Sequence, residues 1–183
     1  MSMRVLLSIL ASPIAFSAGM LTALAARAEV PTEAQVKAAY VLNFAKFTEW
    51  PSTAFPNAST PLQVCVAGNA DTLAGFGAIK GKIVQGREVQ VRHMPKPAEA
   101  QWAGCSIVYL DPSQRTSIPG TLKSLAGLPV LTVSDVDNFV DSGGMLGLLL
   151  VDGRVRFDAN RESVRANGLQ LRAQLLTLAR SVR

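Results

Sequence analysis

The segment Leu62-Gln63-Val64-Cys65-Val66-Ala67, followed by Gly68-Asn69, decides how this chain folds. A short apolar run that ends at a Gly-Asn turn signal is typical of a buried β-strand. Other apolar runs of similar length recur along the chain and are separated by short helical patterns. The buried strand at 62–67 is therefore expected to lie inside a larger sheet.

Helical segments are expected on both sides of this strand. Thr32-x-x-Gln35 fits a capping box that opens a helix, whose apolar stripe of Val36, Tyr40, Phe44 and Phe47 ends before Trp50-Pro51. Further strands are predicted over 82–84, 88–93, 106–110 and 129–133, and helices over 72–79, 98–103 and 122–126. This alternation predicts right-handed crossovers and a mainly parallel sheet flanked by helices.

The C-terminal part departs from this alternation. Strands over 145–151 and 154–157 are joined by Asp152-Gly153, a two-residue turn that favours positive φ, and this predicts an antiparallel hairpin on the edge of the sheet. Asn160 can cap a helix that Asn167-Gly168 ends. A last helix is expected to pack through Leu171, Leu175, Leu178 and Ala179. The predicted fold class is a single-domain α/β protein with a C-terminal antiparallel hairpin and a terminal helix.

Composition limits the possible classes of protein. The 183 residues are 49% hydrophobic and 17% charged, with a net charge of +5 and a mean hydropathy of +0.25. The apolar content excludes a disordered chain, and the length excludes a multi-domain enzyme. Two cysteines and one histidine exclude a disulfide-dense mini-protein and a multi-histidine metal site. We expect no metal and no cofactor.

The N-terminus has the pattern of a secretory signal peptide. Arg4 precedes an uncharged stretch over 5–24, and Ala26-Arg27-Ala28 is a small-x-small cleavage motif. We expect cleavage after Ala28, with 23–25 as a second possible site, and a mature domain over 29–183. An uncleaved membrane anchor is the alternative, but serines, a proline and a glycine dilute the apolar stretch. An exported chain with two cysteines, Cys65 and Cys105, favours a disulfide over two buried thiols.

One segment has the look of a catalytic motif. Asp141-Ser142-Gly143-Gly144 is similar to the nucleophile segment of chymotrypsin-like proteases, and His93 and Asp111 could complete a triad. That fold needs two antiparallel barrels, whereas this chain alternates strands with helices. The expected role of 142–144 is a tight turn leading into the hairpin. No nucleotide-binding loop is present either, so we predict no catalytic residues.

Two sets of residues are candidates for binding. Ligands of parallel sheets bind at the carboxyl ends of the strands, where we expect the loops at Gly68-Asn69, Asp111 and Ser134-Asp135 to line a crevice. The candidate ligand-binding residues there are Asn69, Asp111 and Ser134. The tail from residue 154 has a net charge of +5, which points to an acidic partner or to a solvated helix flank. The candidate partner-binding residues are Arg154, Arg156, Arg161 and Arg165. The modest charge of an exported chain does not favour nucleic acid.

The order of several short motifs resembles that of the YfiR family. The matching segments are Val36-Lys37-Ala38-Ala39-Tyr40, Asn43 to Phe47 with Trp50-Pro51, Gly86-Arg87, Cys105 before an apolar strand, Val130 to Ser134, Gly143-Gly144-Met145, Gly153 to Phe157, Asn160 and Leu175-Leu176. The resemblance covers nearly the whole predicted mature chain. It also matches Cys65 and Cys105 to the family's inter-strand disulfide, while a further cysteine pair of some relatives is absent here.

This resemblance implies a specific role. Members of the family are periplasmic regulators without catalytic activity that hold the periplasmic sensor region of an inner-membrane diguanylate cyclase inactive. They thereby lower cyclic di-GMP and biofilm formation, and an outer-membrane lipoprotein can sequester them. The alternatives are a periplasmic small-molecule sensing module and, more remotely, a hydrolase that uses Ser142. Homodimer formation stays open at this stage.

Overall fold

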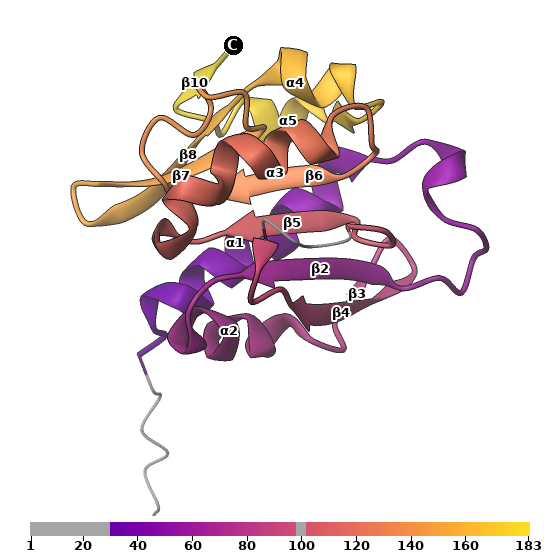
Figure 1. The fold of residues 1–183 in the computed structure, drawn as a ribbon, viewed down its shortest axis with the longest axis horizontal. Coiled ribbons are helices and arrows are strands. Elements are labelled where there is room, and N and C mark those ends of the chain that lie inside the picture. The colour runs from indigo at the N-terminus through magenta and orange to yellow at the C-terminus, as the bar shows by residue number, and fades with distance from the viewer. Residues whose placement is uncertain (1–29, 98–101) are drawn as a thin grey trace, which may run out of the picture. The chain divides into compact units, whose positions relative to one another are not determined.

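One eight-stranded sheet organises the chain (Figure 1). Its order is β10 (Ser181–Val182), β8 (Arg154–Ala159), β7 (Leu146–Val151), β6 (Leu131–Ser134), β5 (Ile107–Leu110), β2 (Leu62–Ala67), β4 (Arg87–His93) and β3 (Ile83–Val84). The computed structural model describes residues 30–97 and 102–183, and residues 31–183 form one compact unit. The five central strands β4, β2, β5, β6 and β7 are parallel, so the predicted mainly parallel sheet is confirmed.

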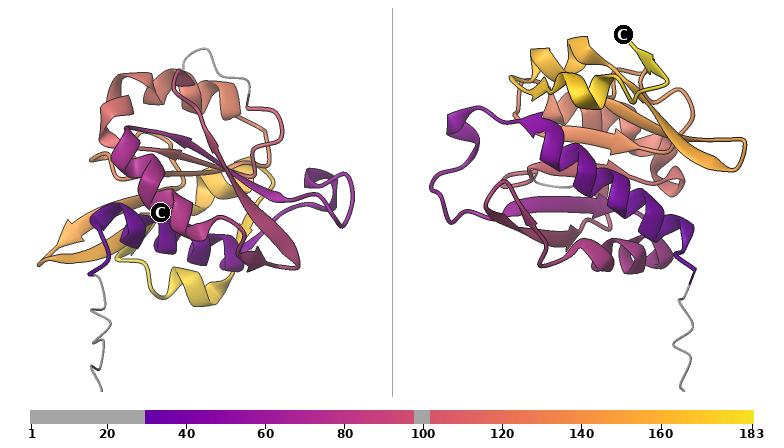
Figure 2. Two further views of the ribbon diagram at one scale, coloured as in Figure 1. Left: turned by 90° about the horizontal axis from the view of Figure 1, so that it is seen from below. Right: turned by 180° about the vertical axis from the view of Figure 1, so that it is seen from behind.

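Helices cover both faces of this sheet. The helices are α1 (Glu33–Phe47), α2 (Ala70–Phe76), α3 (Ile118–Leu125), α4 (Arg161–Ala166) and α5 (Ala173–Leu176). Figure 1 shows α3 in front of the sheet, and the rear view in Figure 2 shows α1 on the opposite face. Short 3-10 turns lie at Ser52–Ala54, Gly77–Ile79 and Pro112–Ser117, and a separate two-stranded sheet joins β1 (Thr48–Glu49) to β9 (Gln170–Leu171).

The alternation of side chains along the strands produces two apolar clusters. Val64 and Val66 of β2 pack in one cluster with Phe44 of α1, whereas Cys65 and Ala67 pack in the other with Leu125 of α3. Successive residues of a strand point to opposite faces, so a strand such as β2, which is apolar except for Gln63, buries both of its faces only when helices cover both sides. This is the physical reason that 62–67 lies in the centre of the sheet.

Several local predictions are confirmed. The capping box of α1 is present, because Gln35 N donates to Thr32 Oγ1 at 3.2 Å and Thr32 N donates to Gln35 Oε1 at 2.8 Å. Asp152 and Gly153 join β7 to β8 with φ values of 49° and 70°. Asn160 caps α4 by accepting a hydrogen bond of 2.8 Å from Ser163 N. In the apolar stripe of α1, Phe44 is buried, while Tyr40 and Phe47 are partly buried.

The prediction for the last forty residues was partly wrong. The terminal helix expected through Leu171 to Ala179 is reduced to α5, because the residues before it form β9 against β1 and the residues after it form β10. The hairpin is not the edge of the sheet, since β10 pairs in parallel with β8 beyond it. Both differences come from backbone hydrogen bonds to distant strands, which override a local helical pattern. The predicted signal peptide at 1–28 and most of the helical turn expected at 98–103 lie outside the described residues.

Candidate functional site

A cavity of about 620 Å³ lies at the carboxyl ends of the parallel strands. Its walls come from the N-terminal turns of α1 and α2 and from the residues that follow β5 and β6, namely Thr32, Glu33, Ala34, Gln35, Lys37, Asn69, Asp71, Thr72, Ala74, Gly75, Tyr109, Asp111, Pro112, Ser113 and Asp135. We name it the switch-point cavity, because the topology reverses here. The chain leaves β2 through α2 toward β4, but leaves β5 through α3 on the other face toward β6. Ligands of open α/β sheets bind in the crevice at such a reversal.

Asp111 forms the centre of one wall of this cavity. Its Oδ2 accepts hydrogen bonds from Asn69 N at 2.8 Å and Thr72 Oγ1 at 2.9 Å, and its Oδ1 accepts from the backbone and hydroxyl of Ser113 at 2.9 and 2.5 Å. Burial by itself would raise the pKa of Asp111, but these hydrogen bonds to the carboxylate outweigh it and lower the pKa below its ordinary value. Asp111 is therefore an ionised group that ties the end of β5 to the start of α2.

Gly68 makes this arrangement possible. A Cβ atom at position 68 would lie 2.5 Å from Asp111 Oδ2, which is closer than any real contact. Asn69 has its own structural task, since its side-chain oxygen accepts from Thr72 N at 2.9 Å and caps α2. The Gly68-Asn69 turn thus ends β2 and also forms part of the cavity wall.

A partly buried charge network forms another part of the cavity wall. Lys37 Nζ lies 2.5 Å from Asp135 Oδ2 and 2.5 Å from Glu33 Oε1, and Tyr109 Oη donates to Asp135 Oδ1 at 2.7 Å. Burial opposes the charge of Lys37, but its hydrogen bonds to Asp135 and Glu33 raise its pKa. Burial first, and then the charge of Asp135, raise the pKa of Tyr109 strongly. The lysine ammonium and the phenol therefore keep their protons at neutral pH.

The structure brings two of the three predicted crevice residues to the cavity. Asn69 and Asp111 line it, whereas Ser134 is fully buried below it and donates to Leu110 O at 2.7 Å. Asp135, which shares the predicted loop with Ser134, does line the cavity, whereas sequence reasoning missed Tyr109 and Lys37. A usable signal existed for one of them, because Glu33 and Lys37 have the i, i+4 spacing of an ion pair on a helix.

The four candidate arginines lie in two separate places. Arg154 and Arg156 are exposed on β8 at the hairpin, and Arg161 and Arg165 are exposed on α4. Strand β8 runs antiparallel to β7. Its first residue therefore lies at the end of the strands that holds the switch-point cavity, and its last residue lies at the opposite end. Three residues of β8 lie between Arg156 and α4's cap Asn160, so roughly 10 Å of strand separates the two pairs. None of the four arginines forms an ion pair within the described residues.

Other tail arginines have partners. Arg180 binds Asp158 at 2.9 and 2.5 Å, Arg172 binds Glu49 at 2.9 Å, and Arg183 pairs with Asp141. Two of these carboxylates lie outside the tail. The excess positive charge of the tail is therefore partly neutralised in the fold, and the arginines of residues 154–183 that form no ion pair lie on β8 and on α4.

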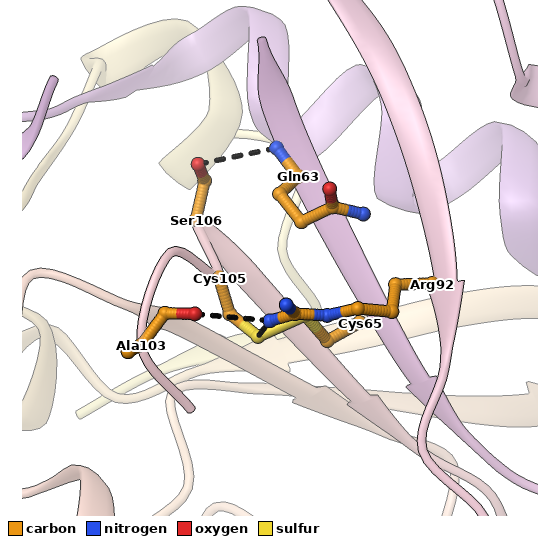
Figure 3. The surroundings of a disulfide bond; sticks show 6 residues. All are labelled: Gln63, Cys65, Arg92, Ala103, Cys105 and Ser106. Atoms are coloured by element: carbon orange, nitrogen blue, oxygen red, sulfur yellow. Dashed lines mark hydrogen bonds between the residues drawn. A yellow bond between two sulfur atoms is a disulfide. The ribbon is translucent and has the colours of Figure 1, made fainter. Parts of the chain in front are cut away.

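The predicted disulfide is confirmed. Cys65 of β2 is bonded to Cys105, which lies just before β5, with 5.9 Å between their Cα atoms (Figure 3). Arg92 of β4, the register partner of Cys65, places Nη2 at 3.3 Å from Cys65 Sγ and 3.0 Å from Cys105 Sγ, and donates to Ala103 O at 3.1 Å. The bond joins two neighbouring parallel strands on the face covered by α3.

The fold does not support the hydrolase alternative, because it places His93 and Ser142 far apart. His93 ends β4, with Nε2 at 3.3 Å from Gly68 O, whereas Ser142 lies before β7 and donates to Asn138 O at 3.0 Å. Strands β2, β5 and β6 separate the two segments, which corresponds to about 19 Å across the sheet. His93 and Ser142 are therefore too far apart for proton transfer.

Residues 30–97 and 102–183 contain neither a membrane-spanning helix nor a metal-binding cluster. Within these residues no helix is long and apolar enough to cross a membrane. The same residues contain no group of three or more histidine, cysteine, aspartate or glutamate side chains that could hold a metal ion. The described residues thus combine a cavity lined by several carboxylates with an exposed cationic hairpin.

Comparison with known proteins defines the class and then the family. The fold is a doubly covered, mainly parallel α/β sheet, and it is similar to the crystal structure of a conserved domain protein from Vibrio cholerae O1 biovar El Tor strain N16961. That similarity has a TM-score of 0.54 at 11% identity and covers 83% of this chain. It spans 60% of the length of the Vibrio protein and shows the fold alone. Residues 34–180 match the YfiR/HmsC-like family, so the chain belongs to this family, as the motif order predicted.

Proposed function

We propose that this protein is a non-catalytic periplasmic regulator that binds the periplasmic sensor region of an inner-membrane diguanylate cyclase and holds the cyclase inactive. Lower cyclic di-GMP and reduced biofilm formation would follow. Membership of the YfiR/HmsC-like family supports this role. The disulfide supports export, because such bonds persist in oxidising compartments such as the bacterial periplasm.

The observation that carries the proposal is the exposed β7–β8 hairpin. Leu150 near its tip is 66% exposed, and Arg154 and Arg156 on the adjoining strand have no carboxylate partner among the described residues. Tyr40 Oη of α1 donates to Val155 O at 2.6 Å and holds the hairpin against the body of the protein. An exposed apolar hairpin tip that is fixed to the body of the protein and flanked by unpaired cations is suited to binding an acidic protein surface.

Repression requires the regulator to distinguish two states of its partner. Only the difference in affinity between the inactive and active cyclase can shift the equilibrium between them. A change from mostly active to mostly inactive needs a differential affinity of about 5 kcal/mol. Contacts at the hairpin must therefore form in one state of the cyclase and be lost in the other. An outer-membrane lipoprotein that covered the same hairpin would relieve repression by competition.

The test is recovery of the cyclase together with a measurement of cellular cyclic di-GMP. The exported protein should retain an inner-membrane diguanylate cyclase in a pull-down, and deletion of the protein should raise the nucleotide. Because Arg154 and Arg156 lie on β8 and Arg161 and Arg165 lie on α4, the two pairs are tested separately. We expect Arg154→Ala with Arg156→Ala to weaken binding about ten-fold at low salt, and less at high salt.

A matched control removes the same charge elsewhere. Lys80→Ala with Lys82→Ala deletes two exposed cations beside β3 and should leave the affinity unchanged. Unchanged affinity for both the Arg154/Arg156 and the Arg161/Arg165 double variants would remove these arginines from the contact surface. If no membrane protein is recovered and cyclic di-GMP does not change on deletion, the regulatory role itself is wrong.

A second function, small-molecule sensing, is favoured by the switch-point cavity. Its volume of about 620 Å³ falls within the range of ligand pockets. Four carboxylates, those of Glu33, Asp71, Asp111 and Asp135, line it against one lysine, so the cavity favours a neutral or cationic molecule. Ala74→Phe would fill the cavity and abolish saturable binding, whereas Ala78→Phe, exposed outside the lining, would not. Saturable binding without any membrane partner would make sensing the main function.

A further inference from the structure

The wall of the switch-point cavity contains a buried negative charge that no cation balances. Asp111 is only 1% exposed, and its lowered pKa keeps it ionised at neutral pH. The groups that donate to its two oxygens are the backbone N–H groups of Asn69 and Ser113 and the hydroxyl groups of Thr72 and Ser113, and all of them are neutral. No ammonium, guanidinium or imidazole group forms an ion pair with Asp111 among the residues that the structure describes. Buried charges in proteins are nearly always paired, so this exception indicates that the balancing charge comes from a bound molecule.

A second carboxylate of the same wall has no partner at all. Asp71 lies in the first turn of α2 and is exposed, and its carboxylate has no hydrogen-bond donor and no ion pair within residues 30–97 and 102–183. Asp111 binds Asn69 N and Thr72 Oγ1, which lie on either side of position 71 in the chain. The start of α2 and the end of β5 therefore form one wall that carries two uncompensated negative charges.

The other charges of the lining do not cancel this excess. Glu33 and Asp135 share the single ammonium group of Lys37, so these three side chains keep one net negative charge. Burial first, and then the charges of Asp135, Asp111 and Glu33, raise the pKa of Tyr109, so three carboxylates lie within electrostatic range of one phenol. In total, four carboxylates face one ammonium group, which leaves three negative charges around the cavity. A concave site lined by one sign of charge concentrates ligands of the opposite sign.

The remaining lining suits a hydrocarbon chain. Ala34, Ala74, Gly75 and Pro112 contribute small apolar surfaces between the charged groups. The carboxylates come from two sides, since Asp71 and Asp111 belong to α2 and the end of β5, whereas the others belong to the start of α1 and the end of β6. Figure 1 shows the first turns of α1 and α2 on the left, where the arrows of β2 and β5 end. An occupant that fits has an apolar middle and a positive charge at each end.

We propose that the switch-point cavity binds an aliphatic diamine, with one ammonium group at the wall of Asp71 and Asp111 and the other at Glu33 and Asp135. This inference rests on the sensing function proposed for this cavity and names the class of ligand. The oxygens of Asp111 already accept two hydrogen bonds each, but the Thr72 hydroxyl that donates to Asp111 keeps lone pairs for an ammonium group. The first ammonium group thus donates to Asp71 and Thr72, and Asp111 balances its charge.

The test uses one six-carbon chain with three different ends. Hexamethylenediamine, hexamethylene glycol and adipate carry two positive, no and two negative charges, and each is titrated into the exported protein by isothermal titration calorimetry. We expect saturable binding of the diamine that weakens as salt is added, and no binding of the glycol or of adipate. Glycol binding as tight as diamine binding would overturn the proposal and leave a sensor of neutral molecules. No diamine binding would overturn it as well, while the pull-down still tests the regulatory role separately.

A matched pair of variants separates the cavity from the overall charge of the protein. Asp71→Asn removes a carboxylate that has no partner in the fold, and it should weaken diamine binding about five-fold at low salt and less at high salt. Glu88→Gln removes an exposed carboxylate of β4 outside the lining and should leave the affinity unchanged. An unchanged affinity for Asp71→Asn, or equal weakening by both variants, would overturn the proposal.

A third measurement locates the bound diamine. Backbone amide signals of Gln35, Thr72 and Gly75, which line the cavity, should shift during the titration, whereas that of Leu150 on the hairpin should not. Shifts at Leu150 without shifts in the lining would overturn the proposal. Magnesium ions that displace the diamine at equal concentration would identify a site for an inorganic cation and overturn it too. Circular dichroism checks that each variant is folded.

Discussion

Tyr109 of β5 donates a 2.7 Å hydrogen bond to the carboxylate of Asp135, whose second oxygen holds the ammonium group of Lys37 on α1. Three elements that are distant in sequence thus meet at one carboxylate. The contact ties the first helix to the carboxyl ends of two strands and fixes one wall of the switch-point cavity.

This network predicts a loss of stability at alkaline pH. The pKa values of Tyr109 and Lys37 are raised in the folded protein above their ordinary values of 10.0 and 10.5. A raised pKa means that the folded state holds its proton more tightly, so the stabilisation is complete below pH 10 and declines as the pH rises further. Urea unfolding at pH 8 and pH 11 should show this decline. Tyr109→Phe should cost about 1 kcal/mol at pH 8 and flatten the pH dependence. An equally steep decline in this variant would contradict the assignment.

The lowered pKa of Asp111 predicts a loss of stability in acid. Its pKa is lowered in the folded state below 3.8, so its contribution is present above that pH and is lost as the pH falls. Asp111→Asn should reduce the free energy of unfolding at pH 7 by about 2–3 kcal/mol, because an amide nitrogen would face donors. Asp71→Asn, an exposed carboxylate in the same cavity, is the control and should change stability by less than about 0.5 kcal/mol. Equal losses in the two variants would show that the hydrogen bonds of Asp111 do not stabilise the fold.

The disulfide is expected to contribute strongly to stability. It closes a loop with a sequence separation of 40 between Cys65 and Cys105. Cys65→Ala with Cys105→Ala should lower the free energy of unfolding by about 4 kcal/mol in the chain-entropy description. Urea unfolding of the oxidised protein and of the double variant measures this difference. The same midpoint for both proteins would mean that the bond constrains a denatured state that is already compact.

The close packing of α2 on α1 depends on Gly75. A Cβ atom at position 75 would lie 2.4 Å from the Cβ of Ala34, so the two helices would have to separate at the cavity wall. Gly75→Ala should destabilise the protein by about 1–3 kcal/mol. Gly77→Ala is the matched control, because nothing lies within 4 Å of its Cβ position and its φ is −53°. This control should be neutral or slightly stabilising in thermal unfolding. Destabilisation by both variants would indicate a helix effect rather than a contact.

Short local sequence signals were enough to predict most of the helices, strands and turns. The capping box at Thr32, the hairpin turn at Asp152-Gly153 and the cap at Asn160 were readable because each depends on residues within a few positions. The strand at 62–67 was readable because all its residues except Gln63 are apolar, so both of its faces need to be buried. The ends of strands then predicted a crevice near Asn69 and Asp111.

The sequence by itself determined the α/β class, the order of the central elements and the pairing of two cysteines, since periodicity, turn chemistry and composition are properties of short stretches. Only the tertiary structure decided that Lys37, Tyr109 and Asp135 meet, that the four candidate arginines are divided between β8 and α4, and that the tail contributes strands β9 and β10. These features depend on contacts between residues far apart along the chain. Their free energy comes from burial and backbone pairing, which no local pattern records.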